Sequence, residues 1–421
     1  MTNHSIAAAS TVGTEDGQAA PPARQQRLMS LDAYRGFIML FLASGGLGLT
    51  EVAKQHPDSF LWQWLAHHTS HVPWLGGGAW DMIQPSFMFM VGMAVPFSLA
   101  NRGMRAIAGQ TFGQRLLPAV WRAAVLVALG VFLASNGKQQ PEFVFVNVLA
   151  QIGLGYVFLV ALAGQGQLRQ LAAIAAITVT TWAAFALFPL PELGVDLTGV
   201  GITAKLAPDV SLPGFFGHWS MNTNVFAAFD SWFLNLFPRE SPFVFNTGGY
   251  QTLNFVPSLI TMILGLMAGE VLRDDGGPLG ASLKTPLGKL SWLLGAGGVC
   301  VVLGVVAGAT VCPLVKRIWT PSWAIFSGGV SLWMVAAFYW AIDVRGWRSW
   351  AWPLVVVGMN SIAIYLAYQL LAGWIKATAK CWISAEMFVG TYDIVWHNMI
   401  VVAVLWLWCW WLYRRQIFLR I

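Results

Sequence analysis

The feature that most constrains this chain is a series of apolar runs, each long enough to cross a lipid bilayer as a helix. About 20 apolar residues span the roughly 30 Å of hydrocarbon in a bilayer. Hydrophobic residues make up 57% of the 421 residues and charged residues only 10%, a balance that excludes an ordinary soluble protein. We therefore predict an all-α integral membrane protein, a polytopic bundle of about ten transmembrane helices. The runs that predict these helices are residues 34–50, 82–100, 117–134, 146–164, 168–190, 252–272, 290–312, 321–342, 351–372 and 393–412.

Two segments fall outside this pattern. Residues 1–27 are rich in Ser, Ala, Thr, Gln and Pro and lack the apolar stretch of a signal peptide. We expect them to form a disordered cytoplasmic tail before a single transmembrane domain, 28–421. Residues 191–250 are too irregular in sequence for a span and too apolar for a solvated linker. We expect this long irregular outer loop to pack over the helix bundle as a lid.

Basic residues predict the orientation of the chain. With the N-terminus inside, most of the 24 Lys and Arg residues fall on the inner side, as the positive-inside rule requires. This bias predicts cytoplasmic N- and C-termini and places His71 and the outer loop on the other face. We expect a bacterial inner membrane, with the lipid bilayer as a partner. Orientation explains the basic excess, so no nucleic-acid partner is expected.

The sequence lacks the motifs of common soluble enzymes. Its four cysteines form no CxxC pair, and no P-loop, GxSxG, HExxH or GxGxxG motif is present. These absences argue against soluble-type hydrolases and Rossmann dehydrogenases. Candidate chemistry therefore rests on polar residues within or beside the apolar runs.

The main candidate is the stretch HVPWLGGGAWDMIQPSFMFMVG, in which His71 precedes Asp81 by ten residues across a glycine-rich turn. A histidine here could accept a proton or an acyl group, and a carboxylate could fix the tautomer of its ring, as in a catalytic triad. The alternative is an ordinary interfacial histidine and an aspartate that caps the following helix. The residues alone leave both interpretations open. His67 and His68 could also bind zinc, but no further ligands complete a tetrahedral set, and we predict no metal.

Other polar residues have similar alternatives. Asp32 and Arg35 could cap and anchor the first helix or contact an anionic ligand. Asn360 and Ser361 could form a helix–helix hydrogen bond or contact substrate.

Three further polar side chains, Gln369, Asn254 and Gln251, could line a shared cavity with them. A group of arginines near the inner ends of the second and third predicted helices could hold phosphates or simply follow the positive-inside rule. These arginines are Arg102, Arg105, Arg115 and Arg122.

A series of segments in the same order resembles the transmembrane acyltransferase family of heparan-α-glucosaminide N-acetyltransferase and its bacterial relatives. The similarity runs from Leu28 to Ile421. Its segments are RLMSLDAYRGFIML, HVPWLGGGAWDMIQPSFMFMVG, NVLAQIGLGY, NTNVFAAFD, VKRIWTPSW, GMNSIAIYL and LYRRQIFLRI.

The resemblance implies acyl transfer across a membrane, from cytoplasmic acetyl-CoA to an amine or hydroxyl of a sugar-type acceptor at the outer face. The active-site histidine of the family falls on His71, the aspartate on Asp81 and an asparagine on Asn360. Expected partners are then acyl-CoA and a saccharide-like acceptor, with a homodimer left open. An acyl-histidine and a ternary complex with His71 as the base both remain open.

The chain also departs from the family pattern. Gly46 stands where an asparagine is usual, Gly248 to Gln251 replace an acidic turn, and Tyr368 and Gln369 replace a His-Glu pair. The change at Gly46 removes a polar side chain and the other two remove charge or titratable groups, so we expect a different acceptor or a loss of activity.

Two functions compete at this point. The first is a membrane acyltransferase in which His71 is the acyl carrier or general base, Asn360 positions the thioester and arginines meet the phosphates of CoA. The second is a proton-coupled transporter or flippase, with His71 and Asp81 as a proton relay and residues 191–250 as an external gate. A non-catalytic membrane scaffold is a third reading.

Overall fold

A computed structural model describes residues 28–101, 112–192, 196–273, 284–382 and 390–419. The predicted tail, 1–27, lies outside them. Across these residues the chain is helical and contains no strand beyond two isolated β-bridges. Nine of the described helices are long and apolar enough to cross a membrane. The prediction of an all-α polytopic membrane protein is therefore confirmed.

The helices follow one another with short connections, apart from the lid. Two short 3-10 turns, η1 (Gly45–Gly48) and η2 (Trp80–Met82), lie next to the candidate site. The α-helices are α1 (Met29–Ala43), α2 (Leu49–Gln55), α3 (Phe60–Thr69), α4 (Ile83–Asn101), α6 (Phe112–Ala134), α7 (Val148–Leu162), α8 (Gln167–Ala186), α9 (Ala207–Val210), α10 (Val225–Phe233), α11 (Phe255–Arg273), α12 (Pro286–Thr310), α13 (Pro321–Tyr339), α14 (Trp352–Gly358), α15 (Ser361–Trp382) and α16 (Asp393–Arg414).

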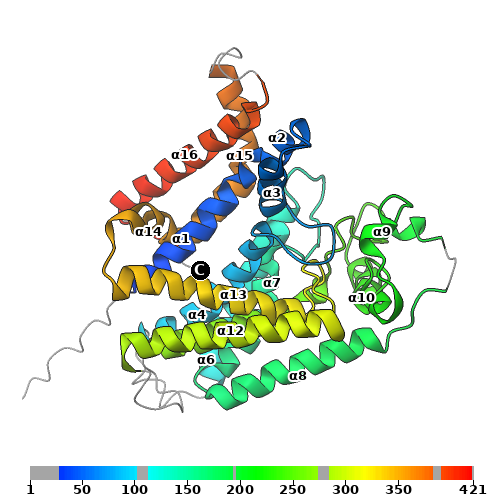
Figure 1. Ribbon diagram of the computed structural model, residues 1–421, viewed down its shortest axis with the longest axis horizontal. Coiled ribbons are helices and arrows are strands. Elements are labelled where there is room, and N and C mark those ends of the chain that lie inside the picture. Colours follow the sequence, from blue (N-terminus) through cyan, green and yellow to red (C-terminus); the bar gives the residue numbers. More distant parts are fainter. Residues whose placement is uncertain (1–27, 102–111, 193–195, 274–283, 383–389, 420–421) are drawn as a thin grey trace, which may run out of the picture.

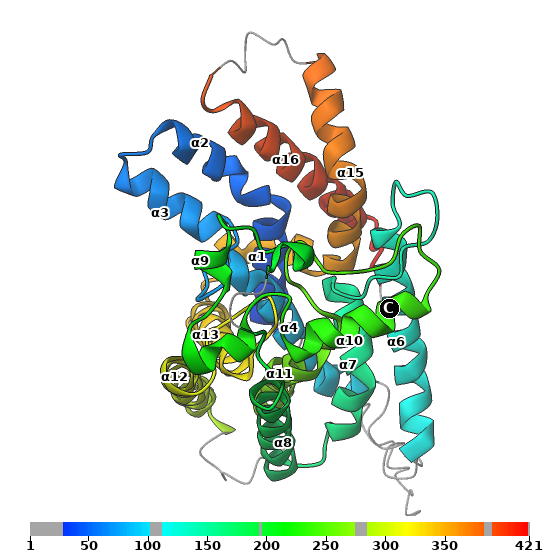
Figure 2. The same cartoon turned by 90° about the vertical axis from the view of Figure 1, so that its right-hand side faces the viewer.

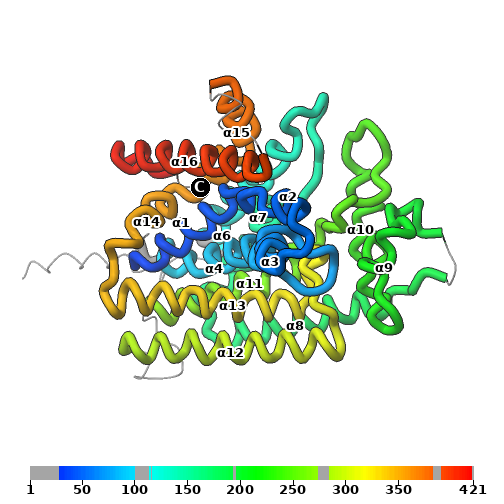
Figure 3. Tube along the Cα trace, turned by 45° about the horizontal axis from the view of Figure 1, so that its top comes forward, coloured from blue at the N-terminus to red at the C-terminus, as the bar shows by residue number. Residues whose placement is uncertain are grey.

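The long helices define two ends of the molecule. Helices α8, α12 and α13 run along its long axis, and α9 and α10 lie together beyond one end of α8 (Figure 1). Helix α1 begins, and α16 ends, at the opposite end (Figure 1). Helices α12 and α13 pack side by side, as Figure 3 also shows. We call the end with α9 and α10 the lid end and the other the tail end.

Glycines let the central helices touch backbone to backbone. A Cβ added at Gly92 of α4 would lie 1.9 Å from the Met262 carbonyl oxygen, and one added at Gly265 of α11 would lie 2.0 Å from the Phe89 carbonyl oxygen. Small residues allow such close approach in membrane bundles, where packing drives helix association. Helix α4, which follows directly on Asp81, is thereby held against α11, the most deeply buried span.

Three predicted spans differ from the structure. The run 34–50 is interrupted by η1 between α1 and α2, where Gly45 to Gly48 have positive φ. The run 146–164 forms only the 15 residues of α7, about 22 Å of helix. The run 351–372 is broken between α14 and α15. Helix α14 ends where Gly358 packs so tightly on α1 that a Cβ there would lie 1.8 Å from the Asp32 carbonyl oxygen. Backbone contact of this kind is not visible in hydropathy.

The segment 196–250, which we call the lid, contains more helix than its sequence predicts. Helix α10 begins at Asn224, whose side-chain oxygen accepts hydrogen bonds from the backbone N–H groups of Phe226 and Ala227. The lid packs on the loop that carries His71, since the buried Trp74 indole donates to the Trp219 carbonyl oxygen at 3.0 Å. Figure 2 shows α9 and α10 in front of the bundle, with α2, α3, α15 and α16 projecting to one side.

Candidate functional site

The loop between α3 and η2 brings His71 back to the start of α4. Gly76 has φ +83°, a value that glycine adopts without strain. A Cβ at Gly78 would lie 2.6 Å from the His67 carbonyl oxygen, so only glycine allows the loop to return onto α3. The glycine-rich turn in the sequence therefore has a direct physical purpose: it folds ten residues into a closed loop whose ends meet.

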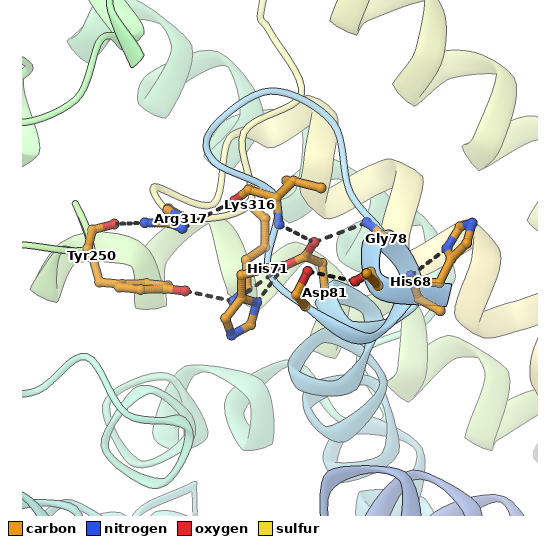
Figure 4. Close-up of polar contacts among 12 residues, drawn as sticks. His68, His71, Gly78, Asp81, Tyr250, Lys316 and Arg317 are labelled. Carbon is orange, nitrogen blue, oxygen red and sulfur yellow. Dashed lines mark hydrogen bonds and ion pairs between the residues drawn. The ribbon is translucent and has the colours of Figure 1, made fainter. Parts of the chain in front are cut away.

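His71 and Asp81 form a hydrogen-bonded pair, with 2.7 Å between Nδ1 and Oδ1 (Figure 4). The Asp81 side chain is 1% exposed, whereas that of His71 is 41% exposed. The second carboxylate oxygen, Oδ2, accepts hydrogen bonds from the N–H groups of Gly78 at 3.0 Å and Val72 at 3.3 Å. The aspartate is thus immobilised behind a histidine that solvent or substrate can reach.

A lysine from a distant segment completes the cluster. Lys316, just before α13, is 4% exposed, and its Nζ lies 3.9 Å from Asp81 Oδ1 and 3.4 Å from His71 Nδ1 (Figure 4). The same ammonium donates to the Tyr250 hydroxyl at 3.1 Å and lies 4.8 Å from the centre of its ring. Lysines are almost never this buried unless they are paired. Lys316 therefore places a positive charge beside the pair.

The adjacent arginine ties three loops together. Arg317 donates to the Gly248 carbonyl oxygen at 2.9 Å and to the Val72 carbonyl oxygen at 3.2 Å. Its own carbonyl oxygen accepts from the Asn254 side chain at 2.7 Å. The candidate residue Asn254 thus lies beside the cluster, where it holds the segment that carries Lys316.

Lys316, Arg317 and Tyr250 are the residues that sequence reasoning did not single out. Lys316 and Arg317 lie in VKRIWTPSW, one of the segments that carry the family resemblance. A signal was nevertheless present: two adjacent basic residues lie near the end of a predicted span that we expect to face outward, against the positive-inside rule. A basic residue on the disfavoured side requires a local reason, which here is the buried aspartate.

Other predicted residues lie away from this cluster. The Asn360 amide donates to the Ile417 carbonyl oxygen and accepts from the Leu419 N–H, both at 3.1 Å, so it clamps the C-terminal segment. Ser361 begins α15 directly after it. Among the described hydrogen bonds, none links either residue to His71.

Asp32 and Arg35 form an ion pair at 3.4 Å on α1. They lie near the α14–α15 junction, since Gly358 packs on Asp32. Gln369 donates to the Tyr365 hydroxyl at 3.4 Å within α15. Gln251 is buried, and its side chain donates to Asn222 of the lid at 3.5 Å. The predicted shared cavity of these polar groups is not seen in their contacts.

The glycine at position 46 has a structural reason. Gly46 has φ +63°, and a Cβ there would lie 2.4 Å from the Thr69 carbonyl oxygen at the end of α3. A glycine is therefore required for α3 to approach η1 as it does. Because Gly46 has no side chain, the backbone at Thr69, two residues before His71, can pack closely against η1.

The imidazoles of α3 have local partners. His68 Nδ1 accepts from the Ala79 N–H at 3.3 Å, and the rings of His67 and His68 meet edge to face. Within the described part of the chain, no group of three or more His, Cys, Asp or Glu side chains could hold a metal ion.

Comparison with models of protein families and with curated proteins found no match to this sequence. The function must therefore be inferred from the geometry and from the motifs of the chain itself.

Proposed function

We propose that this protein is an integral-membrane acyltransferase that moves an acetyl or longer acyl group from acyl-CoA to an amine or hydroxyl of a saccharide-like acceptor. In this proposal His71 is the acyl carrier or general base, and Asp81 orients it. The observation that carries the proposal is the 2.7 Å contact between a buried carboxylate and a half-exposed imidazole. This is the arrangement of the base and its orienting acid in a triad.

The geometry supports a definite proton path. When Asp81 accepts a hydrogen bond from Nδ1–H, the proton stays on Nδ1 and the lone pair on Nε2 is free. Nε2 takes a proton from the acceptor amine or hydroxyl as that atom attacks the thioester carbonyl. The new acyl–N or acyl–O bond forms, the C–S bond breaks, and the CoA thiolate leaves and receives the proton.

Two neighbours suit this chemistry. The Tyr250 hydroxyl accepts from Lys316 and therefore keeps its own proton free for donation to an oxyanion. Its ring centre lies 6.5 Å from that of His71. The Lys316 ammonium adds a positive charge that favours the negative charge developing on the thioester oxygen.

A cavity lined by other loops is where we propose that the remote part of an acceptor larger than a single sugar binds. Its volume is about 360 Å³, and it is lined by residues of two loops, 138–143 and 238–245. The second loop continues through five residues to Tyr250, a reach of at most about 17 Å. The remote part of an acceptor could bind in this cavity while its reacting group lies at His71.

The proposal includes a location and a donor side. Acetyl-CoA would come from the cytoplasm and the acceptor from the outer face of a bacterial inner membrane, with both termini cytoplasmic. The arrangement in which α1 begins and α16 ends away from the lid supports termini on one side (Figure 1). No resident metal is part of this mechanism.

The test uses purified full-length protein, radiolabelled acetyl-CoA and a panel of amino sugars and neutral saccharides. Wild-type protein is expected to transfer label, and His71→Ala is expected to bind acetyl-CoA but to transfer label about 1,000-fold more slowly. His67→Ala is the matched control, because His67 is an exposed histidine four residues away. Absence of both binding and labelling in the wild type would contradict the proposal.

The same experiment separates this function from a proton-coupled transporter. Acyl-CoA should raise the melting temperature of an acyltransferase by mass action, whereas a transporter of another solute has no reason to respond. Solute movement in proteoliposomes without chemical change, together with no stabilisation by CoA, would favour the transporter.

A further inference from the structure

One arginine lies within the membrane-spanning part of α6, outside the His71 cluster. Arg122 is the only charged residue in the apolar stretch 116–134 of α6. A cation in the hydrocarbon region is costly and is usually paired or functional. Because side chains of a helix tilt toward its N-terminus, the guanidinium reaches toward the tail end.

The contacts of Arg122 leave its charge without a counterion. Its Nη1 donates to the Tyr156 hydroxyl of α7 at 2.9 Å, and the guanidinium carbon lies 4.7 Å from the centre of the same ring. The buried Nε has no hydrogen-bond partner. Among the residues that the structure describes, no carboxylate lies within ion-pair distance of this arginine. Neutral contacts alone therefore hold a charged group in place.

The guanidinium lines a small cavity between α4, α6 and α7. The cavity measures about 30 Å³, and its lining includes Ser98, Pro118 and Tyr156 as well as Arg122. Ser98 and Pro118 lie within about two turns of the ends of α4 and α6 that face the tail end. The cavity therefore lies at the depth where hydrocarbon gives way to headgroups.

The size and surroundings of the cavity favour a lipid over a soluble cofactor. Since a single water needs about 10–15 Å³, the space admits a few waters or part of one oxyanion, but not a nucleotide. The neighbouring positions Leu117 and Trp121 on α6 are each 73% exposed and face outward from the bundle. A lipid at this position can lie along α6 with its phosphate at Arg122.

We propose that Arg122, Tyr156 and Ser98 form a binding site for the phosphate of an anionic phospholipid between α4, α6 and α7. The guanidinium supplies the charge and the free N–H donors, and the Tyr156 hydroxyl, which accepts from Arg122, keeps its proton for the phosphate. Basic pockets between transmembrane helices recognise anionic headgroups in this way. The site is independent of acyl transfer at His71.

The test compares ligands on detergent-purified full-length protein. Phosphatidylglycerol is expected to raise the melting temperature of the wild type by roughly 3 °C or more, and phosphatidylcholine is expected to have little effect. Native mass spectrometry should show retained phosphatidylglycerol. Arg122→Gln is expected to lose both effects. Arg169→Gln is the control, because Arg169 is an exposed arginine near the tail end that bonds to Gln165.

Tyr156→Phe is the second variant, which keeps the charge and removes one donor. It should weaken lipid retention severalfold without abolishing it, and it tests the site if Arg122→Gln does not fold. The proposal would be overturned if phosphatidylglycerol stabilised Arg122→Gln as much as the wild type. If only Tyr156→Phe folds, equal stabilisation of that variant and the wild type would overturn it. It would also be overturned if coenzyme A, and not phosphatidylglycerol, required Arg122.

Discussion

Two histidine–aspartate pairs in the described part of the chain have nearly equal separations and opposite burial. His71 Nδ1 lies 2.7 Å from Asp81 Oδ1, and His397 Nδ1 lies 2.8 Å from Asp393 Oδ1. In the first pair the acid is 1% exposed and the histidine 41% exposed. In the second the histidine is 8% exposed and the acid 37% exposed.

The difference follows from how each pair is connected. Asp393 and His397 are four residues apart in the first turns of α16, and His397 Nδ1 also contacts the Asp393 carbonyl oxygen at 2.8 Å. Such a pair is local and stabilises a helix start. His71 and Asp81 are joined by a glycine-dependent loop and receive Lys316 from another part of the chain. Only the His71–Asp81 pair presents a half-exposed ring with a buried acid behind it.

The largest expected difference between the pairs is in catalysis. His71→Ala should lower acyl transfer by about 1,000-fold, because general-base or nucleophilic catalysis is lost. His397→Ala should leave the rate near that of wild type and cost about 1–2 kcal/mol of stability. The measurement is transfer of labelled acetyl groups together with thermal unfolding. Equal rate losses in the two variants would remove the distinction.

The two aspartates should differ as the two histidines do, since loss of Asp81 should lower the transfer rate and loss of Asp393 should not. Asp81→Asn should lower transfer by about 100-fold, since the amide no longer selects the productive tautomer of His71. The double variant His71→Ala/Asp81→Asn should be no slower than His71→Ala alone, because the two residues act as one unit. Asp393→Asn is the matched control and should transfer at the wild-type rate. A double variant much slower than His71→Ala would mean that Asp81 acts separately.

A lysine, Lys316, should contribute to the transfer rate at the His71–Asp81 pair, which it contacts. Lys316→Met should lower transfer by about 10- to 100-fold, because the charge near Tyr250 and Asp81 is lost. Lys316→Arg should recover part of the rate by keeping that charge. Lys54→Met, which removes an exposed lysine paired with Glu51, should have no effect. Unchanged rates in Lys316→Met would show that Lys316 has only a structural role.

The close packing of the backbone near His71 can be tested by substituting two glycines. Gly46→Asn should lower the free energy of unfolding by about 2 kcal/mol, because the new Cβ meets the Thr69 carbonyl oxygen. Gly76→Asn is matched for positive φ, but nothing lies within 4 Å of its Cβ, so the loss should be smaller. Thermal unfolding and transfer assays report both effects. Greater damage from Gly76→Asn would contradict the close-approach argument.

The smallest expected effect is the pH dependence of stability that comes from a buried aspartate without a histidine partner. Asp230 of the lid is fully buried, its Oδ2 accepts from the Thr252 N–H at 2.9 Å, and burial raises its pKa from 3.8 to about 6. The folded state binds this proton more tightly than the unfolded chain, so stability falls as the pH rises from about 4 through 6.

The expected result is a melting temperature a few degrees lower at pH 7 than at pH 4.5, with a weaker dependence in Asp230→Asn. Asp196→Asn is a control of opposite sign. Hydrogen bonds from Thr198 lower the pKa of the exposed Asp196, so its contribution is lost as the pH falls. An unchanged pH profile in Asp230→Asn would show that this carboxyl does not titrate in the folded protein.

Most of the fold was predictable because membrane spans are local in sequence. Hydropathy identified each long helix, but it could not identify the break between Gly358 and Ser361. That break depends on the crossing of α1 and α14, which are joined by more than 300 residues of chain. The lid helix α10 was missed because its nine residues are too short for a periodic signal.

The candidate site was predictable only in part. His71 and Asp81 could be paired from their spacing and the glycines between them, since a short loop limits how far its ends can separate. Lys316 could not be added in this way, because 245 residues separate it from His71. Asn360 carries a family likeness, yet its contacts lie with the C-terminal segment, Ile417 and Leu419.

The sequence by itself determined that this is a helical membrane protein and that a histidine and an aspartate sit at the two ends of a flexible turn. Those properties depend on composition, run length and short spacing, which are local. Tertiary structure alone decided that Asp81 is buried while His71 stays open, and that Lys316 and Tyr250 join them. Burial and long-range contact arise from the packing of helices and lid, and no short stretch of sequence encodes that packing.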